Sequence, residues 1–381
     1  MAALSKSLEE TLCWRSCQEL LHPRSCRRAA LENLWRFGWS NAKYYLPVVL
    51  LHLGKNGIRL GGGSSCNLLL DALWYYVQLV VGGVLNASLI SISMCSLRNL
   101  LGKFHLYTLL FLPAAIGGSF CACFPRRVRQ LQHTAIFQSL IESLLLHSHP
   151  LASAVTHSLP LQTLIFMCCS AVILEGKRRR CGHNGFWFLT PDVAATVGHN
   201  CSLHIVRGIR NYLLIGFVLD LFKAIVSCTK ASGEGHLRHL SLQSTAWLGC
   251  YVGIYRAVHC YLQHSSVVRR HIPVIKDSLR HPLAGFLAGL SYLLYPKPTI
   301  LSYALLEAMR TLWASHRDTK KVTKQPQAYG IGDLAFPVAL AYLIHNYVLQ
   351  FQRVSGLSGV IIDSTTANYA LNIRKRLARL C

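Results

Sequence analysis

Charged side chains are scarce in this sequence, and acidic ones are the scarcest. Only 14% of its 381 residues are charged, and 15 acidic residues stand against 39 basic ones. A helix needs about 20 apolar residues to cross the hydrocarbon core of a bilayer. Four long stretches carry no charge at all: residues 72–97, 104–125, 143–174 and 334–352. These stretches exclude an ordinary soluble protein and predict an all-α, polytopic helical membrane protein.

Sequence signatures of several enzyme classes are absent. The sequence has no His-His dipeptide, which argues against the three-box arrangement of di-iron desaturases. It also lacks a G-x-S-x-G nucleophile elbow, a Walker A loop and a G-x-G-x-x-G turn. We therefore expect no enzymatic activity, no catalytic residue and no cofactor.

A clear targeting signal is missing as well. Residues 1–28 mix acidic, basic and cysteine side chains without an apolar core, so no secretory signal peptide is expected. The final Leu380-Cys381 matches neither a Ser-Lys-Leu address nor a prenylation box. These features favour a reducing, intracellular setting, in which cysteines inside apolar stretches act as small hydrophobic side chains.

Basic residues give the chain a formal net charge of +24. They cluster between the uncharged stretches, for example at residues 177–180 and 374–376. No aromatic-and-basic stripe typical of an RNA-binding sheet interrupts this pattern. The distribution fits helix flanks that contact anionic lipid headgroups, so we expect membrane lipids as partners and no nucleic-acid binding.

A long polar segment near the middle divides the apolar stretches into two groups. We expect five regions: a Cys-containing N-terminal segment (1–36), a first membrane half (37–175), a polar connector (176–204), a second membrane half (205–353) and a basic C-terminal tail (354–381). Basic residues follow almost every apolar stretch, so the positive-inside rule does not predict the orientation.

One short unit occurs in both halves, at residues 112–144 and 283–309. Each copy holds a small-residue apolar helix, an aromatic-Pro-basic corner at Pro125 or Pro296, and a helix with a single carboxylate. Interrupted apolar segments at matching places in two halves are the best sequence pointer to the site of a transporter. A close-packed core built from the same small residues is the alternative interpretation.

Glycines in the apolar helices indicate close helix packing. Glycines four residues apart remove side chains from one helix face and let two backbones touch. We expect packing contacts within the chain at Gly249, Gly253, Gly285, Gly289, Gly117 and Gly118. The same pattern also occurs in helix dimers, so a homo-oligomer stays open.

Four carboxylates form a candidate intramembrane polar site: Asp71, Glu142, Asp220 and Glu307. A carboxylate at membrane depth is costly and usually faces a polar cavity or a partner. Glu142 and Glu307 are the more interesting pair, because they lie in the two copies of the repeated unit. The alternative is that each lies near the interface and pairs with a basic neighbour such as Arg310.

A candidate metal site lies near the N-terminus, at Cys13, Cys17, His22 and Cys26. These ligand types suit tetrahedral zinc, and their spacing lies near that of a zinc knuckle without matching it. Reduced structural cysteines and a lipid-modified site are the alternatives. A looser group follows in the central connector: Cys181, His183, His199, Cys201 and His204.

Several segments resemble the transmembrane protein 135 family, whose members are peroxisomal and mitochondrial membrane proteins distantly like Tim-type inner-membrane translocase subunits. The matching residues include segments 1–7, 22–26 and 101–104, and Asn200-Cys201 with Gly208. The strongest matches are Trp247-Leu-Gly-Cys-Tyr-Val-Gly-Ile-Tyr-Arg256 and the segment from Ala284-Gly-Phe-Leu-Ala-Gly289 to Tyr303.

This resemblance implies a non-enzymatic, multi-pass protein of the mitochondrial or peroxisomal membrane. It implies a role in the balance of mitochondrial fission and fusion, in peroxisome organisation and in lipid homeostasis. The action would be through partner binding, with a dynamin-related fission GTPase as a partner. A transporter or channel for lipid or a small metabolite, using the paired Gly-rich helices, is the alternative function.

Overall fold

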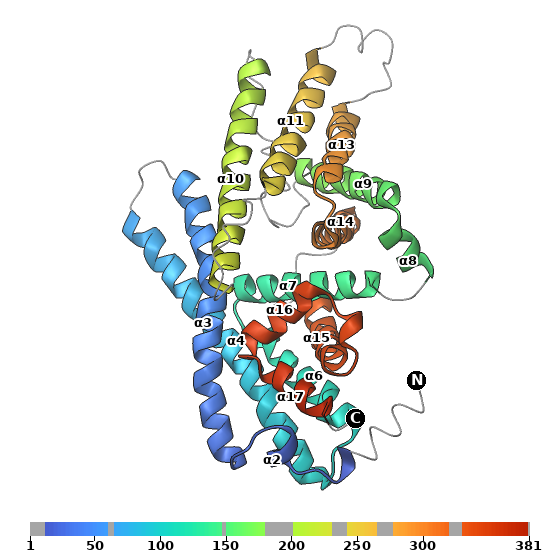
Figure 1. The fold of residues 1–381 in the computed structure, drawn as a ribbon. Helices are drawn as coiled ribbons and strands as arrows, with labels where there is room; N and C mark the ends of the chain where they lie inside the picture. The colour runs from blue at the N-terminus through green and yellow to red at the C-terminus, as the bar shows by residue number, and fades with distance from the viewer. Residues whose placement is uncertain are drawn as a thin grey trace. The chain divides into compact units, whose positions relative to one another are not determined.

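The computed structural model describes residues 12–59, 65–146, 150–179, 201–230, 242–264, 277–319 and 330–379. Within these ranges every regular element is a helix and none is a strand, which confirms the prediction of an all-α fold (Figure 1). The helices form two compact units. Unit 1 comprises Met1–His147 and Pro326–Cys381, and unit 2 comprises Ser148–Gln325.

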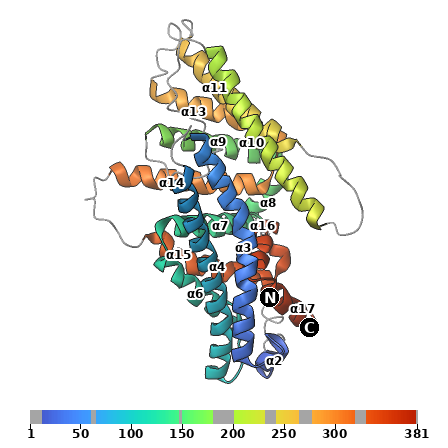
Figure 2. The ribbon, with the colours of Figure 1, turned by 90° about the vertical axis from the view of Figure 1, so that its left-hand side faces the viewer.

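Unit 1 is built on two long helices, α3 (Cys26–Arg59) and α4 (Ser65–Leu101), which lie side by side (Figure 2). The short α2 (Cys17–Leu20) precedes them. They are followed by α5 (Leu106–Leu109), α6 (Phe111–Ser119), the 3₁₀ helix η1 (Phe120–Cys123) and α7 (Arg126–Leu145). The C-terminal part of the chain completes the unit with α15 (Ile331–Leu349), η4 (Phe351–Arg353), α16 (Gly356–Thr365) and α17 (Tyr369–Leu377).

Unit 2 is built on a second pair of neighbouring helices, α10 (Cys201–Lys230) and α11 (Gln243–His264) (Figure 1). The chain enters the unit through α8 (Pro150–His157) and α9 (Leu159–Arg178). After the pair come α13 (Asp277–Ala288), the 3₁₀ helix η3 (Gly289–Leu294) and α14 (Pro298–Thr319).

The two units repeat one order of packing. In unit 1, α3 packs on α4, α4 packs on α6, and α15 packs on both α6 and α7. In unit 2, α10 packs on α11, α11 packs on α13, and α9 packs on both α13 and α14. We call α15 and α9 the closing helices of their units. Each helix from α10 to α15 begins about 170 residues after its counterpart among α3, α4, α6, α7 and α9, which is the spacing of an internal duplication.

The bounds of the units differ from those of the predicted membrane halves because of the closing helices. Helix α9 follows the first set of helices in sequence but packs in unit 2, and α15 follows the second set but packs in unit 1. Of the predicted connector, residues 180–200 lie outside the described part of the chain. The predicted tail contains α16 and α17, and the predicted N-terminal segment contains α2 and the start of α3.

Proline sets the corner between the second and third members of each repeat. A residue that precedes proline is driven out of the α-helical region. Phe124 accordingly takes an extended backbone, with ψ of 157°, before Pro125, and α7 begins at the next residue. Tyr295 likewise leaves the helical region, with φ of −149° and ψ of 71°, before Pro296. Both copies therefore have a helix, a 3₁₀ turn, a proline corner and a second helix.

Four helical segments are long and apolar enough to cross a bilayer within the described ranges: Asn67–Leu101, Leu106–Cys123, Leu159–Arg178 and Ile331–Leu349. Each coincides with one of the uncharged stretches. Helix α4 also exposes large apolar side chains along its length, namely Leu69, Leu70, Leu73, Trp74, Val77, Val81 and Leu85. An apolar face of this length is unfavourable in water and suits contact with lipid.

Candidate functional site

The glycines of the first repeated unit lie where α6 meets two other helices. A methyl group at Gly117 would lie 2.5 Å from Cγ1 of Ile90 and 3.0 Å from the backbone oxygen of Asn86, both on α4. A methyl group at Gly118 would lie 3.0 Å from Cα of Pro337 on α15. Neighbouring glycines thus open α6 to α4 on one side and to the closing helix on the other.

The glycines of the second repeated unit lie against the closing helix α9. A methyl group at Gly285 would lie 2.8 Å from Cδ1 of Leu174 and 3.1 Å from the backbone oxygen of Ser170. At Gly289 it would lie 2.5 Å from Cα and 3.0 Å from N of Met167. Backbone atoms cannot move aside as side chains can, so glycine is required here for the two helices to approach.

The two copies match without a gap between the glycine and the corner. Gly118 lies seven residues before Pro125, and Gly289 lies seven residues before Pro296. Each of these two glycines meets the backbone of the closing helix of its unit. In this register Glu142 lies 17 residues after its proline and Glu307 lies 11 residues after its own. The six-residue difference places the two carboxylates about 9 Å apart along their equivalent helices.

The remaining G-x-x-x-G pattern packs against α10. A methyl group at Gly249 would lie 2.6 Å from Cδ2 of Leu213, and at Gly253 it would lie 3.2 Å from Cδ1 of Ile209. The contact is between a glycine face and long side chains rather than between two backbones. It leaves an open apolar groove of about 350 Å³ that these four residues line together with Ala246 and Cys250.

Two of the four candidate carboxylates hold basic partners. Asp71 is exposed and its Oδ2 lies 3.1 Å from Nη1 of Arg127. Glu307 is 5% exposed, and its Oε1 accepts a hydrogen bond of 2.8 Å from Nη1 of Arg310. Arg310 is the partner that the interfacial alternative named for Glu307.

Asp220 caps a helix. Its Oδ2 accepts hydrogen bonds of 2.9 Å from both the backbone N–H and the Oγ1 of Thr245 in the first turn of α11. The first N–H groups of a helix have no partner within the helix, so a carboxylate placed there is stabilising. Asp220 is only 3% exposed, and this contact accounts for a buried acid on α10.

Glu142 lies buried on α7 between two serines that bond to α16. Ser143 Oγ lies 3.2 Å from Ser358 Oγ and accepts a hydrogen bond of 3.2 Å from the backbone N–H of Ser355. Ser358 Oγ donates to the backbone oxygen of Ser139 at 3.3 Å. Glu142 therefore lies in the polar seam by which the C-terminal helices attach to α7, and no contact joins it to Glu307.

A fifth buried acid escaped the sequence reasoning. Asp333 lies in the first turn of α15, where its Oδ1 is 3.3 Å from Nε of Arg129 and 3.5 Å from Nε2 of His133. Its side chain is 8% exposed. The signal was its place, immediately before the uncharged stretch 334–352, but only the fold brings it to two basic residues of α7.

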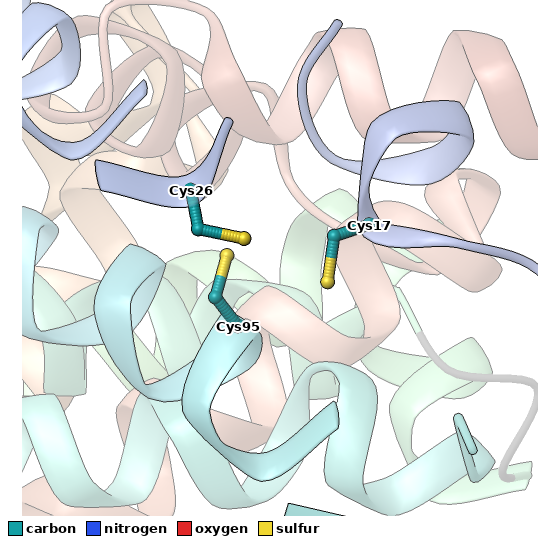
Figure 3. A group of neighbouring side chains, drawn as sticks. All are labelled: Cys17, Cys26 and Cys95. Atoms are coloured by element: carbon teal, nitrogen blue, oxygen red, sulfur yellow. The ribbon is translucent and has the colours of Figure 1, made fainter. Parts of the chain in front are cut away.

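The predicted N-terminal metal ligands are partly brought together. The Sγ atoms of Cys17, Cys26 and Cys95 all lie within 4.8 Å of one another, and Figure 3 shows the three sulfurs turned toward a common point. Cys13 lies outside this group, and Cys95 on α4 takes its place. Burial, and then the nearby Cys26, raises the pKa of the Cys17 thiol. Cys95 could not be found from spacing, because it is 69 residues from Cys26 in the sequence.

The looser connector group does not assemble in the described residues. Cys181, His183 and His199 lie outside them, and Cys201 forms a disulfide with Cys260 of α11. The expectation of reduced cysteines is wrong for this pair. The backbone oxygen of His204 accepts a hydrogen bond of 2.6 Å from Nη1 of Arg256, whose guanidinium lies against Gly208.

Comparison with known proteins gives no further identification. No protein-family model matches the chain, and no solved structure matches it. The resemblance to the transmembrane protein 135 family therefore stays a prediction from the sequence.

Proposed function

We propose that the chain is a multi-pass protein of the mitochondrial or peroxisomal membrane that regulates the balance of mitochondrial fission and fusion, peroxisome organisation and lipid homeostasis through partner binding. The four apolar helices support a place in a membrane. The resemblance to the transmembrane protein 135 family supports the organelle and the role. It also suggests a dynamin-related fission GTPase as the protein partner, alongside membrane lipids.

The observation that carries this proposal is the position of the residues with the strongest resemblance. Trp247 and Tyr251 of α11 and Tyr292 of η3 are buried around Phe166, with ring centroids 6.4, 6.3 and 5.0 Å from that ring. Tyr251 also bonds Ser170 of α9 through its hydroxyl at 2.7 Å. The resembling segments therefore form the interior of unit 2, so the likeness concerns residues that define the fold.

The carboxylates support partner binding over transport. Asp71, Asp220 and Glu307 each make a contact that explains their charge, and Glu142 lies in a polar seam between helices. A proton- or ion-coupled transporter needs carboxylates that face a pathway. None of these four lines any of the three cavities described here.

The proposal is tested by deleting the gene in cells and imaging a tagged chain against mitochondrial and peroxisomal markers. We expect the tagged chain in one or both membranes, resistant to alkaline extraction, and a changed mean mitochondrial length after deletion. Wild type should restore the length, and so should the double variant Glu142→Gln, Glu307→Gln. Unchanged organelle shape, or a chain found in neither membrane, contradicts the proposal.

A transporter or channel for lipid or a small metabolite is the second candidate, and the repeated packing order of the two units favours it. Duplicated membrane units are common in transporters, with the site near the interrupted helices. Under this candidate, the Glu142→Gln, Glu307→Gln variant should abolish flux in reconstituted vesicles while inserting normally. Normal flux in that variant, or no flux in wild type, counts against it.

A further inference from the structure

Three cysteines and a histidine from separate elements meet at one place in unit 1. Cys17 is the first residue of α2, Cys26 is the first residue of α3, and Cys95 lies in the last third of α4. Nε2 of His22, from the turn between α2 and α3, lies 3.3 Å from Sγ of Cys95. In a tetrahedral zinc site with Zn–S bonds of about 2.3 Å, sulfurs lie about 3.8 Å apart and sulfur and nitrogen about 3.6 Å apart. The observed separations are compatible with these values.

The histidine is held in the form that binds a metal. Nδ1 of His22 lies 2.5 Å from the backbone oxygen of Arg24. Because a carbonyl oxygen only accepts, Nδ1 must carry the proton, which leaves the lone pair of Nε2 directed toward the sulfurs. Metal-binding histidines usually donate their other ring N–H to a carbonyl or carboxylate in this way. His22 is 5% exposed, so this orientation is fixed within the protein.

The N-terminal segment is anchored so that these groups stay together. Leu20 and Leu21 are buried in the main hydrophobic cluster of unit 1, together with Met94 and Ile373. Ser16 caps α2, and Nε of Arg98 donates a hydrogen bond of 3.2 Å to the backbone oxygen of Arg15. Three thiolates and one Zn²⁺ carry a net charge of −1, and Arg98 lies near enough to Cys17 to compensate for it.

We propose that Cys17, Cys26, Cys95 and His22 bind one zinc ion in a closed, structural site. All four positions of a tetrahedral ion are then filled by the protein, as in structural zinc sites generally. The ion clamps the N-terminal segment and the start of α3 to the end of α4. This site is independent of the proposed function, which neither requires nor supplies it.

Other uses of the same cysteines fit the geometry less well. A disulfide would join two of the sulfurs and leave the third, with a correctly oriented imidazole, unused. A two-iron cluster divides its ligands between two iron atoms and spreads them further apart than three sulfurs within 4.8 Å of one another. A path for the ion is also present, because a cavity of about 240 Å³ borders His22, Cys26 and Cys95.

The test is the zinc content of the full chain purified in detergent. We expect one zinc per chain in wild type and loss of that zinc in Cys17→Ser, Cys26→Ser, Cys95→Ser and His22→Gln. The matched control is Cys13→Ser, which removes a neighbouring cysteine outside the group and should keep its zinc. Cys123→Ser, at an exposed free cysteine, is the second control.

Two measurements on the wild-type protein keep the test valid if a variant fails to fold. Replacement of zinc by Co²⁺ should give the intense visible absorption of tetrahedral cobalt thiolate. Alkylation of the native chain should spare Cys17, Cys26 and Cys95 until a chelator is added. A wild-type chain that binds no zinc, a disulfide between two of the three cysteines, or zinc loss in Cys13→Ser with retention in Cys95→Ser would each overturn the proposal.

Discussion

Gly289 marks the closest approach of two backbones in unit 2, and its replacement tests that packing. In Gly289→Val, the new Cβ would lie 2.5 Å from Cα of Met167, so α9 must move or the contact must open. Overpacking of this kind typically costs about 1–3 kcal/mol. We expect a lower midpoint of thermal unfolding for the detergent-solubilised protein, measured by intrinsic fluorescence.

Gly38→Ala is the matched control for this substitution. No heavy atom lies within 4 Å of the position where its Cβ would stand. Alanine is favoured over glycine within a helix by up to about 1 kcal/mol, so the midpoint should stay unchanged or rise slightly. An unfolding midpoint for Gly289→Val equal to that of wild type would mean that η3 does not approach α9 as described.

Single residues differ in how far the sequence alone could assign them. The glycines could be proposed as contact points because a missing side chain acts on whatever helix lies opposite. Cys13 and Cys95 show the limit of this reasoning, since spacing along the chain favoured the first and the fold brings the second to Cys17. Asp333 was missed for the same reason, because its partners Arg129 and His133 lie on a helix about 200 residues earlier.

At the scale of elements, the proline corners are the part of the fold that local sequence determines. Pro125 and Pro296 each end a 3₁₀ turn and precede a new helix, an effect that acts on the adjacent residue and needs no tertiary contact. The partners of each helix were not predictable in this way. They depend on which apolar and glycine-bearing faces meet, and on residues far apart in the sequence.

The pair α10 and α11 carries a covalent link whose removal is a second test. The Cα atoms of Cys201 and Cys260 lie 6.1 Å apart, within the usual range for a disulfide. Cys201→Ser and Cys260→Ser should each lower the free energy of unfolding by about 2–4 kcal/mol, and the double variant should lose no more than either single one. Denaturant titration of the purified protein measures this.

Cys250→Ser provides the control on the same helix, since Cys250 is exposed and free. Its unfolding should match wild type. The disulfide itself is read from unreduced peptides by mass spectrometry. Labelling of both Cys201 and Cys260 by a thiol reagent, in protein that has not been reduced, would contradict the link.

For the whole molecule, the central claim is a duplicated set of membrane helices whose closing helices are exchanged. The uncharged stretches predicted the four apolar helices, because composition and length alone decide whether a helix suits a bilayer. The related halves were inferred from the proline corners. The exchange of α9 and α15 was not, because it follows from helix partners and leaves no mark on composition.

Expression of the chain as two pieces, residues 1–190 and 191–381, tests this claim most directly. The first piece holds α9 but lacks α15, and the second holds α15 but lacks α9, so each unit needs a helix from the other piece. We expect either piece alone to be degraded or aggregated in membranes, and the two expressed together to co-purify as a stable pair. Two pieces that each accumulate as stable monomers and do not associate would contradict the exchanged architecture.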